Sequence, residues 1–478
     1  MLHVQFIRMS NTSDPARHTF HLQPDDWAHA EFAHADLGDD RRTRRLVAIA
    51  SLFAQRPTAP ITWASGSWRQ AKAAYRFMDN DHIDSCDISL AHETATLGRL
   101  GRQDLVLVAQ DTSYLDFSAH PATQGLGSIG TNPKNPERGA VMHCSLAMTA
   151  QGLPLGLIDS LIFTRKAKRA KAKRVIKEKE SRKWLQSLAA CQEAARAHPQ
   201  TAIVNIADRE ADIYEFLAMA CEAEAPPNCH VLVRAKCERK LQDSEQSLWQ
   251  RVSKGRVAER YSVQLRRRDG RPQRKARMSL RHSKVTIKPP VKLSHLGSIE
   301  VWAVLAREVG APKGVDPVCW KLLSTMPVTT VAQARRCVQW YGLRWQIEVY
   351  FKVLKSGCGI ERRQLRSLDR LRRALAIDQA AASRILALTM AARELPERSC
   401  ELWLGAAQWR ALWTHIHRKR RTPSRAPTIR QAVMWIGRLG GHMGRANDGP
   451  PGPITLWRGY ERLSDLTRMW EVCHAKAN

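Results

Sequence analysis

Residues 341–357 read YGLRWQIEVYFKVLKSG, and this run predicts an amphipathic helix. At about 100° per residue, one face of that helix carries Tyr341, Arg344, Glu348 and Lys355. The opposite face, which such a helix buries, carries Leu343, Ile347, Tyr350 and Leu354. The polar face has two interpretations. It is either a solvated surface with an i,i+4 ion pair between Arg344 and Glu348, or part of a functional site that other segments complete.

The charge of the chain points to a polyanionic partner. Its 478 residues include 76 Lys plus Arg against 45 Asp plus Glu, a formal net charge of +31. A protein this basic binds nucleic acid through the release of counterions, so nucleic acid is the leading partner. The length allows two or three domains, each with its own core.

A membrane surface is the competing polyanion. The sequence has no lipidation motif and no uncharged apolar run near the ~20 residues of a spanning helix. Its first residues, MLHVQFIRMSNTSDPARH, lack an apolar core of signal-peptide length. The 11 cysteines include no CxxC pair, so neither a zinc site nor a disulfide framework is expected. We therefore expect a cytosolic protein without a membrane partner.

Residues 1–80 are predicted to form a helical N-terminal DNA-binding domain. DLGDDRRTRRLVAIASLFAQRP at 36–57 and SGSWRQAKAAYRFMDN at 65–80 read as two helices with a proline-marked break between them. The first helix carries a basic cluster, in which the candidate DNA contacts are Arg41, Arg42 and Arg45. The alternative is a helical bundle whose basic face is simply solvated.

Residues 81–390 are predicted to form an α/β core. Apolar runs that read as strands lie within 104–117, 141–163 and 201–217. The first strand is expected to end at Asp111, the second run reads as a hairpin, and the third strand is expected to stop at Asp208 before a helix begins. Five further strand-like runs at about 229–330 read as a β-rich insertion. Two strongly basic runs lie at 165–177 and 266–277. Helical patterns return at about 331, and residues 391–478 are predicted to form a helical C-terminal domain.

Three carboxylates occupy comparable positions in separate predicted elements. Asp111 and Asp208 each follow an apolar run, and Glu348 lies on the polar face of the amphipathic helix. Two divalent ions about 3.5–4 Å apart need such oxygen ligands to stabilise the attacking and leaving oxygens of a phosphoryl transfer. We therefore predict that these carboxylates bind metal. The alternatives are turn or capping roles for the two aspartates, and Glu210 or Asp212 in place of Asp208.

The basic residues beside Glu348 suit DNA phosphates, because arginine binds them in a bidentate fashion and lysine acts as a point charge. The order Tyr341, two residues, Arg344, three residues, Glu348, six residues, Lys355 matches the YREK signature of the DDE transposases of the bacterial insertion-sequence group four, the Tn5-like family. The resemblance extends to LGDDRRTRRLV at 37–47, QDTSYL at 110–115, KESRKW at 179–184, ADREADIYEFL at 207–217 and RLGGHM at 438–443.

The resemblance implies an RNase H-like catalytic core with a β-rich insertion, between a helical DNA-binding domain and a helical dimerisation domain. Asp111, Asp208 and Glu348 match the metal-binding triad of the family, which implies two Mg²⁺ ions, with Mn²⁺ as a substitute. Tyr341, Arg344 and Lys355 match contacts to the phosphates of the transposon end and to the strand that is cut.

Two further residues are placed by the resemblance. Trp320 matches an aromatic residue that stacks on a flipped base during hairpin formation, and the alternative is a buried strand tryptophan. Arg234 matches an arginine near the active site. The chain departs from the family pattern in the extra residues before the first basic helix and in the basic run at 165–177, which bears on how a DNA end is gripped.

The implied activity is cut-and-paste transposition. The protein would bind terminal inverted repeats in double-stranded DNA, cleave through a hairpin intermediate and join the 3′ ends to target DNA. It would act as a homodimer in the bacterial cytoplasm, associated with the nucleoid. The alternatives are an inactive or domesticated DNA-binding derivative, against which the intact acidic and YREK residues argue, and an RNase H-like host nuclease, which would not join strands.

Overall fold

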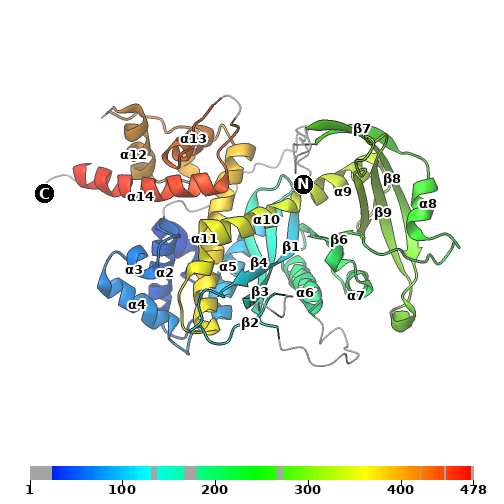
Figure 1. The fold of residues 1–478 in the computed structure, drawn as a ribbon, viewed down its shortest axis with the longest axis horizontal. Coiled ribbons are helices and arrows are strands. Elements are labelled where there is room, and N and C mark those ends of the chain that lie inside the picture. Colours follow the sequence, from blue (N-terminus) through cyan, green and yellow to red (C-terminus); the bar gives the residue numbers. More distant parts are fainter. Residues whose placement is uncertain are drawn as a thin grey trace.

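A ten-stranded sheet runs through the computed structural model, which describes residues 24–130, 137–165, 180–265, 273–419, 421–445 and 448–474 (Figure 1). The strand order is β2-β3-β1-β5-β6-β10-β9-β8-β7, and β4 pairs with β3. The strands are β1 (Leu105–Asp116), β2 (Gly127–Ser128), β3 (Arg138–Thr149), β4 (Pro154–Phe163), β5 (Ala202–Ala207), β6 (Cys229–Arg234), β7 (Glu259–Leu265), β8 (Arg274–Ile287), β9 (Ile299–Glu308) and β10 (Cys319–Ser324).

The first half of this sheet is buried on both faces. Strand β1 pairs antiparallel with β3 and parallel with β5, and its continuous apolar run is typical of a strand that is buried on both faces. On one face α6 (Arg182–Ala197) packs over Val106 and Val108, and Trp184 and Leu188 join the same core cluster. On the other face Leu107 and Ala109 belong to a second cluster, which includes the long helix α11 (Leu368–Glu394).

The second half of the sheet is built from the predicted insertion. All five strand-like runs between 229 and 330 form strands. The first of them, β6, pairs parallel with β5 and so extends the central sheet instead of beginning a separate layer. Strand β10 then pairs antiparallel with β6, so that β7 to β10 continue one sheet across the molecule. The mixed α/β architecture with helical flanks agrees with the predicted fold class.

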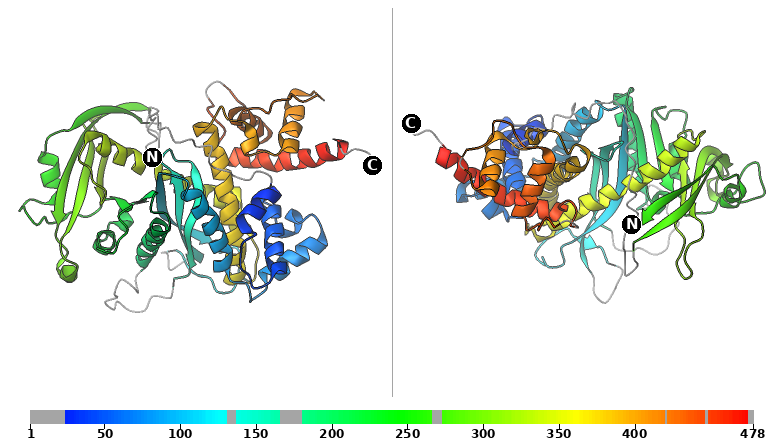
Figure 2. Two further views of the ribbon diagram at one scale, coloured as in Figure 1. Left: turned by 180° about the vertical axis from the view of Figure 1, so that it is seen from behind. Right: turned by 90° about the horizontal axis from the view of Figure 1, so that it is seen from above.

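Helices gather at the other end of the molecule, where the N-terminal and C-terminal helical groups lie side by side (Figure 2). The N-terminal group is α1 (Pro24–Phe32), α2 (Asp40–Gln55), α3 (Ile61–Ala64), α4 (Trp68–Met78) and α5 (Ser85–Leu100). The C-terminal group is α12 (Ala406–His417), α13 (Ile429–Leu439) and α14 (Pro453–His474). Within the sheet half lie α7 (Tyr214–Met219), α8 (Leu248–Lys254), α9 (Val331–Leu343) and α10 (Trp345–Lys352).

Helix α11 lies between the helical groups and the sheet. Its apolar window is long enough to cross a membrane by length and composition, but this window is 100% buried inside the protein. Arg373 at one end donates to the carbonyl oxygens of Met78 and Ile83, at 2.8 and 2.6 Å. Arg384, further along the helix, donates to the Tyr460 hydroxyl on α14, at 2.8 Å. The helix therefore serves as a core element that connects both helical groups.

Candidate active site

Asp111 lies on β1, and Asp208 directly follows the neighbouring strand β5. The parallel register of β1 and β5 ends with Ala109 opposite Ile206, and two residues further along each chain lie the two aspartates. Asp111 returns to the sheet face of Ala109, and Asp208 is the first residue after β5, at the start of the next turn. The charge of Asp208 acts on the Asp111 carboxyl, so the two side chains lie near each other. The sequence predicted that each aspartate follows an apolar run, and the pairing explains why the two runs end together.

The strand that carries Asp111 is longer than its apolar run. β1 continues to Asp116, since its antiparallel pairing with β3 extends from Asp111 opposite Cys144 to Asp116 opposite Gly139. Asp111 therefore lies within a strand, at the point where β1 loses its β5 neighbour. The expectation that the strand ends there was wrong, because polar residues keep a strand when a partner strand still takes their backbone hydrogen bonds.

Glu348 comes from the predicted amphipathic helix, which is not one regular helix. It consists of α9 and α10 with a break at Arg344, followed by a turn of π-helix at Val353–Gly357. Ile347, Tyr350 and Leu354 are buried as predicted, and Leu343 is half-buried. Their packing holds α10 against β1, with Glu348 toward Asp111. A π-turn of this kind is frequent at functional sites.

Arg344 joins two of the three carboxylates. Its Nη1 donates to Asp111 Oδ2 at 2.8 Å, and its Nη2 pairs with Glu348. The predicted i,i+4 ion pair is therefore real, but it is not a solvated surface pair, since the Arg344 side chain is only 14% exposed. Asp111 Oδ1 also accepts from the Thr112 backbone N–H at 2.7 Å. The guanidinium thus lies between Asp111 and Glu348.

The electrostatics place all three carboxylates within reach of one another. Burial raises the pKa of Asp111, Arg344 opposes this, and the charge of Asp208 adds to the rise. Burial likewise raises the pKa of Glu348, again opposed by Arg344 and increased by Asp111 and Asp208. For Arg344, burial alone would lower the pKa, but the charge of Asp111 and further groups raises it. The cluster is therefore a site of like-charge repulsion held by one cation.

The three carboxylates are suitable ligands for a hard divalent cation, but they are not arranged to bind one in this structure. Three carboxylates supply oxygen ligands and negative charge, which is what Mg²⁺ and Mn²⁺ prefer. In the described part of the chain, no three His, Cys, Asp or Glu side chains stand close enough to hold an ion as they are. Arg344 occupies two of the oxygens that an ion would need. Metal binding therefore requires this side chain to move.

The rival acids near Asp208 have other partners. Asp212 is buried, pairs with Arg239, and accepts from the backbone N–H groups of Lys236 and Cys237 at 2.6 and 2.7 Å. The Glu210 side chain is 63% exposed and lies 3.8 Å from Lys183. Asp208 itself caps the short turn that follows, where its Oδ1 accepts from Glu210 N at 2.7 Å. Its capping role and its place in the acidic cluster are thus compatible.

Tyr341, Trp320 and Arg234 form a partly buried group beside the carboxylates. The Trp320 ring on β10 is 8% exposed and meets Tyr341 edge to face, with centroids 5.4 Å apart. Burial raises the pKa of Tyr341, while the charges of Arg344 and Arg234 and a hydrogen bond with Arg234 oppose the rise. This position fits the buried-tryptophan alternative, because a stacked base would need an exposed ring. A base-stacking role for Trp320 stays a prediction.

Lys355 faces β1, together with residues that the sequence did not single out. Its Nζ donates to the Tyr114 carbonyl oxygen and lies 3.1 Å from Glu361. The Tyr114 ring is 40% exposed, and the Arg165 guanidinium lies over it, 4.8 Å from the centroid. An exposed aromatic residue three positions after Asp111 is the signal that marks Tyr114 as a further candidate DNA contact.

Two arginines of the basic helix α2 contact residues that lie close to them in the chain. Arg41 pairs with Asp39 at 3.0 Å, although its side chain is 84% exposed. Arg42 donates to the Leu37 carbonyl oxygen at 2.9 Å and is half-buried, whereas Arg45 is exposed. The three arginine side chains therefore differ in how accessible they are to DNA. Two exposed tryptophans of the same domain, Trp63 at 64% and Trp68 at 74%, are further candidate contacts that the pattern of basic residues does not mark.

Part of the predicted DNA-contacting surface lies outside the described residues. The basic run at 165–177 is described only at Arg165, and the basic loop at 266–277 only from residue 273 onward. The structure therefore bears on neither run as a whole.

Comparisons with known proteins match three families in order along the chain. Residues 24–83 match the family described as transposase DNA-binding, residues 156–383 the transposase DDE domain, and residues 380–470 the transposase Tn5 dimerisation domain. Asp208 and Glu348 fall within the DDE match, and Asp111 precedes it.

A solved structure also aligns with the chain, the cryo-EM structure of a piggyBac transposase synaptic complex with hairpin DNA. It is 9% identical, covers 98% of this chain and 83% of that chain, and has a TM-score of 0.36, too low to support an inference. The three matched families cover the N-terminal helices, most of the α/β layer with Asp208 and Glu348 of its acidic cluster, and the C-terminal helices. The chain belongs to the Tn5-like DDE transposases.

Proposed function

We propose that this DNA transposase is active and carries out cut-and-paste transposition. It binds inverted repeats at the two ends of an element as a homodimer, cleaves there by Mg²⁺-dependent phosphoryl transfer with two ions, and joins the 3′ ends to target DNA. Mn²⁺ substitutes for Mg²⁺, and cleavage passes through a hairpin intermediate. Transposition takes place in the cytoplasm, at the nucleoid.

The observation that carries this proposal is the closeness of Asp111, Asp208 and Glu348, two of which are bonded by Arg344. A derivative that had lost activity would have no need for three acids in one partly buried cluster, because the repulsion among them is costly. DDE domains act with divalent metal ions, and such ions supply charge stabilisation to the attacking and leaving oxygens.

The residues of the chain have separate tasks in this scheme. Asp111, Asp208 and Glu348 provide the oxygen ligands. Arg344 leaves Asp111 and Glu348 and turns its fork to a phosphate beside the scissile bond, which exchanges carboxylate partners for a phosphate of similar geometry. Lys355 neutralises a second phosphate as a point charge. Phosphoryl transfer asks the protein mainly for this positioning and charge stabilisation.

The Trp320 and Tyr341 pair has a place in the hairpin step. Trp320 would have to leave the edge-to-face contact with Tyr341 to stack on a flipped base. Because one aromatic contact replaces another, such a movement costs little free energy. Arg234, which contacts Tyr341, would hold the tyrosine in place while the tryptophan moves.

The test is cleavage and joining with the natural DNA ends. Inverted repeats in the DNA that flanks the coding region would supply the substrate, and purified protein would be incubated with a labelled end duplex, a target plasmid and Mg²⁺. We expect three products: a nicked end, a covalently closed hairpin that denaturing gels resolve, and joined target DNA. Cleavage without joining would favour a nuclease, and binding without cleavage would favour an inactive derivative.

A further inference from the structure

Strands β7 to β10 separate their charged side chains between the two faces of the sheet. Residues that lie directly opposite each other in antiparallel strands point to the same face. Arg260 on β7 lies opposite Ser279 on β8, which in turn lies opposite Arg307 on β9, so the two arginines share a face. Because side chains alternate along each strand, the same register places on this face Arg260, Lys275, Arg277, Arg281, Arg307 and Lys321, which we call the cationic face.

The carboxylates of the same four strands lie on the opposite face of the sheet. They are Glu259, Glu300 and Glu308, and the pairing register alternates them with the residues of the cationic face. Each of these carboxylates already has a cationic partner. In the same order, the partners are Arg335 of α9 at 2.9 Å, Lys284 at 2.8 Å, and Arg274. Strands β7 to β10 therefore supply the cationic face with positive charge and with no carboxylate to balance it.

Two members of the cationic face have contacts within the protein. Arg281 Nε donates to the Gly255 carbonyl oxygen at 3.0 Å, and the Lys321 ammonium group lies over the Trp249 ring, 5.5 Å from its centroid. The other four are exposed, and among the described residues none of them pairs with a carboxylate: Arg260, Lys275, Arg277 and Arg307. Unbalanced positive charge on one surface attracts a polyanion.

The spacing of these four side chains allows several phosphates to be bound at once. Lys275 and Arg277 are two residues apart on β8, which is roughly 7 Å along the strand. Arg260 and Arg307 lie on the strands that flank β8, roughly 10 Å apart across the sheet. Double-stranded DNA carries one negative charge per about 1.7 Å of its axis. A duplex that rests on the cationic face therefore presents phosphates to more than one of its cations.

The cationic face lies on the other side of the sheet from the carboxylate cluster. Ala109, whose face Asp111 shares, belongs to the same hydrophobic cluster as Trp320 of β10. Leu305, which lies opposite Arg281 and so on the cationic side, belongs to the other cluster, which includes residues of α6 and α8. Figure 1 shows β7 to β9 at the end of the molecule away from the helical groups. A duplex that lies across the carboxylates therefore reaches the cationic face only if it turns round the edge of the sheet.

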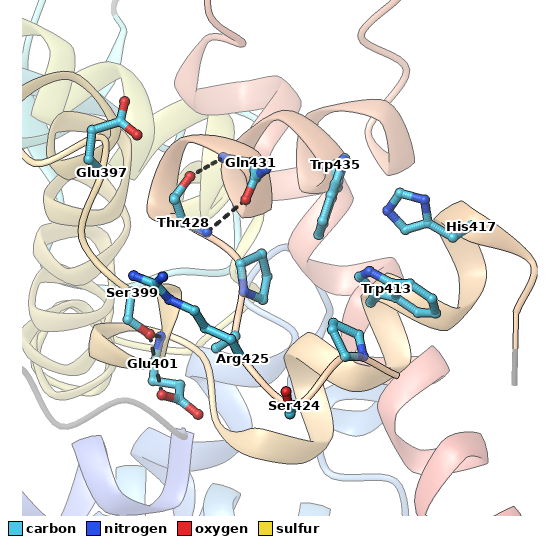
Figure 3. Close-up of a pocket in the computed structure, with 13 residues that line it drawn as sticks. Glu397, Ser399, Glu401, Trp413, His417, Ser424, Arg425, Thr428, Gln431 and Trp435 are labelled. Atoms are coloured by element: carbon cyan, nitrogen blue, oxygen red, sulfur yellow. Dashed lines mark hydrogen bonds between the residues drawn. The ribbon is translucent and has the colours of Figure 1, made fainter. Parts of the chain in front are cut away.

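A pocket of about 1010 Å³ in the C-terminal helical group has a mixed charge instead (Figure 3). Glu397 and Glu401 line it, together with one arginine, Arg425. Because carboxylates repel phosphates, this pocket is a poorer site for a polyanion than the cationic face. Arg425 is exposed and therefore offers a control for the loss of a positive charge elsewhere in the chain.

We propose that the cationic face binds a second segment of double-stranded DNA, through its phosphates and without regard to sequence. The site goes beyond the proposed function, which places DNA only at the N-terminal helices and the carboxylate cluster. An anionic membrane is the competing polyanion. The exposed large apolar side chains of the described chain lie outside strands β7 to β10, so the cationic face has none to insert into a bilayer. Duplex DNA requires only the charges that this face presents.

The test uses the full chain and a fluorescent duplex of random sequence, with affinity measured by anisotropy over a range of salt. The double variant R277Q/R307Q should bind this duplex about tenfold more weakly. Its log–log salt slope should fall by about 1.8, which is about 0.9 for each of two lost phosphate contacts. If affinity and slope both stay at the wild-type values, the cationic face is a solvated surface and the proposal is wrong.

A charge-matched control separates the cationic face from the net charge of the protein. K284Q/R425Q also removes two exposed cations, one that is paired on the opposite face of β8 and one beside the carboxylates of the C-terminal pocket. It should leave affinity and slope close to the wild-type values. Equal losses in the two double variants would assign the effect to net charge and overturn the proposal. A lower melting temperature for R277Q/R307Q than for wild type would assign these arginines a structural role and also count against it.

A capture assay tests whether the bound segment is a second one. Protein is loaded on an immobilised duplex, and a labelled duplex of random sequence is then added. Wild type should retain the labelled duplex, whereas R277Q/R307Q should hold the first duplex and lose most of the second. Equal capture by both proteins would refute a second segment at this face. Binding to vesicles that contain phosphatidylserine, lost in R277Q/R307Q while capture of DNA is kept, would transfer the face to a membrane. Neither assay uses a metal ion or a transposon end, so a failure of the proposed cleavage would leave their results interpretable.

Discussion

Arg344 reduces the charge repulsion within the cluster of Asp111, Asp208 and Glu348 when no other cation is bound. It bonds both Asp111 and Glu348, and these bonds oppose the rise in their pKa that burial produces. The same fork matches a phosphate group. One side chain can therefore hold the site together before DNA arrives and hold the DNA afterwards, which explains why its shape matters more than its charge.

This gives a prediction for Arg344→Lys. A lysine keeps the charge but cannot make two parallel bonds, so the phosphate beside the scissile bond should be misplaced while end binding survives. We expect a tenfold or greater loss in single-turnover cleavage of a pre-bound end, a barrier increase of roughly 1.4 kcal/mol. Arg362→Lys, at an exposed arginine of the following segment, is the control and should cleave normally. Equal rates for Arg344→Lys and wild type would remove Arg344 from the chemistry.

Asp208 allows a substitution that isolates metal binding. Asparagine caps a turn as well as aspartate does, so Asp208→Asn should keep the fold and the binding of DNA ends but lose metal-dependent cleavage. Glu210→Gln is the matched control, since Glu210 is exposed and should be dispensable. Cleavage assays and melting curves on both variants check the assignment. Normal cleavage by Asp208→Asn, or loss of cleavage in Glu210→Gln, would transfer the role to a neighbour.

At this scale the sequence marked candidate residues, whose roles stay predictions, but did not specify their contacts. The order of Tyr341, Arg344, Glu348 and Lys355 was sufficient to mark them as a group. The pattern could not predict that Tyr341 is buried against Trp320, or that Lys355 reaches a backbone carbonyl of β1. Both contacts come from segments far apart in the chain, and periodicity within one helix carries no information about them.

Among elements, α2 illustrates the difference between a basic pattern and a free basic surface. Arg42 is half-buried and bonds the Leu37 carbonyl oxygen, whereas Arg45 is exposed. Loss of a phosphate contact lowers the salt slope of duplex binding by about 0.9. We therefore expect Arg45→Ala to weaken end binding and lower the slope by that amount.

Arg42→Ala should act differently from Arg45→Ala, because it removes a bond within the protein. We expect it to lower the free energy of unfolding by about 1 kcal/mol and to change the salt slope little. Binding isotherms at several salt concentrations and urea titrations on both variants provide the measurements. Identical slopes for Arg45→Ala and wild type would place this face of α2 in solvent.

A buried ion pair links helices α1 and α5 to the sheet. Glu31 on α1 bonds Arg99 on α5 at 2.9 Å and pairs with His92, while Arg99 Nε donates to the Leu155 carbonyl oxygen on β4 at 2.6 Å. Burial alone would raise the pKa of Glu31, but Arg99 and His92 outweigh it and lower the pKa from 4.5 to about 2. The pair therefore contributes stability above about pH 4.5, and this contribution is lost as the pH falls toward 2.

Glu31→Gln tests this linkage. We expect the free energy of unfolding to fall by about 3 kcal/mol at pH 7, and the difference from wild type to shrink as the pH is lowered from 4.5 toward 2. Urea titrations at several pH values would measure it. Asp81→Asn, whose side chain is 99% exposed, should show no such difference. A constant gap between Glu31→Gln and wild type at all pH values would contradict the linkage.

Element boundaries were predicted less well than element types. All five strands of the predicted insertion are present, yet β6 belongs to the central sheet because it pairs with β5. Likewise β1 extends past its apolar run because β3 continues beside it. In both cases the partner strand sets the boundary, and partners distant in sequence leave no mark in the local pattern.

Across the whole molecule, one hydrophobic cluster joins segments that the sequence divides into three ranges. It contains Phe53 of α2, Ala109 of β1 and Leu463 of α14. Helix α11 passes through the centre of this cluster, where Arg363 and Asp378 form a buried pair, and the Arg363 guanidinium lies 4.1 Å from the Phe53 ring. The helical groups at the two ends of the chain should therefore lose their structure together.

Asp378→Ala tests this cooperation. Asp378 is fully buried, and removal of one partner leaves the Arg363 charge without compensation, which costs about 3–5 kcal/mol. Because Arg363 lies against Phe53 and α11 bonds α14 through Arg384, amide protection should fall in α2 and α14 together. Hydrogen exchange and urea titration provide the measurements.

The matched control for Asp378→Ala lies on the same helix. Asp369 has a side chain that is 70% exposed and pairs with Arg372 three residues on, so Asp369→Ala should cost no more than about 0.5 kcal/mol. If Asp378→Ala lowered protection only within α11 and left α2 and α14 unchanged, the two helical groups would be independent folding units. The continuous cluster argues against that result, since each group buries its apolar face on the same helix.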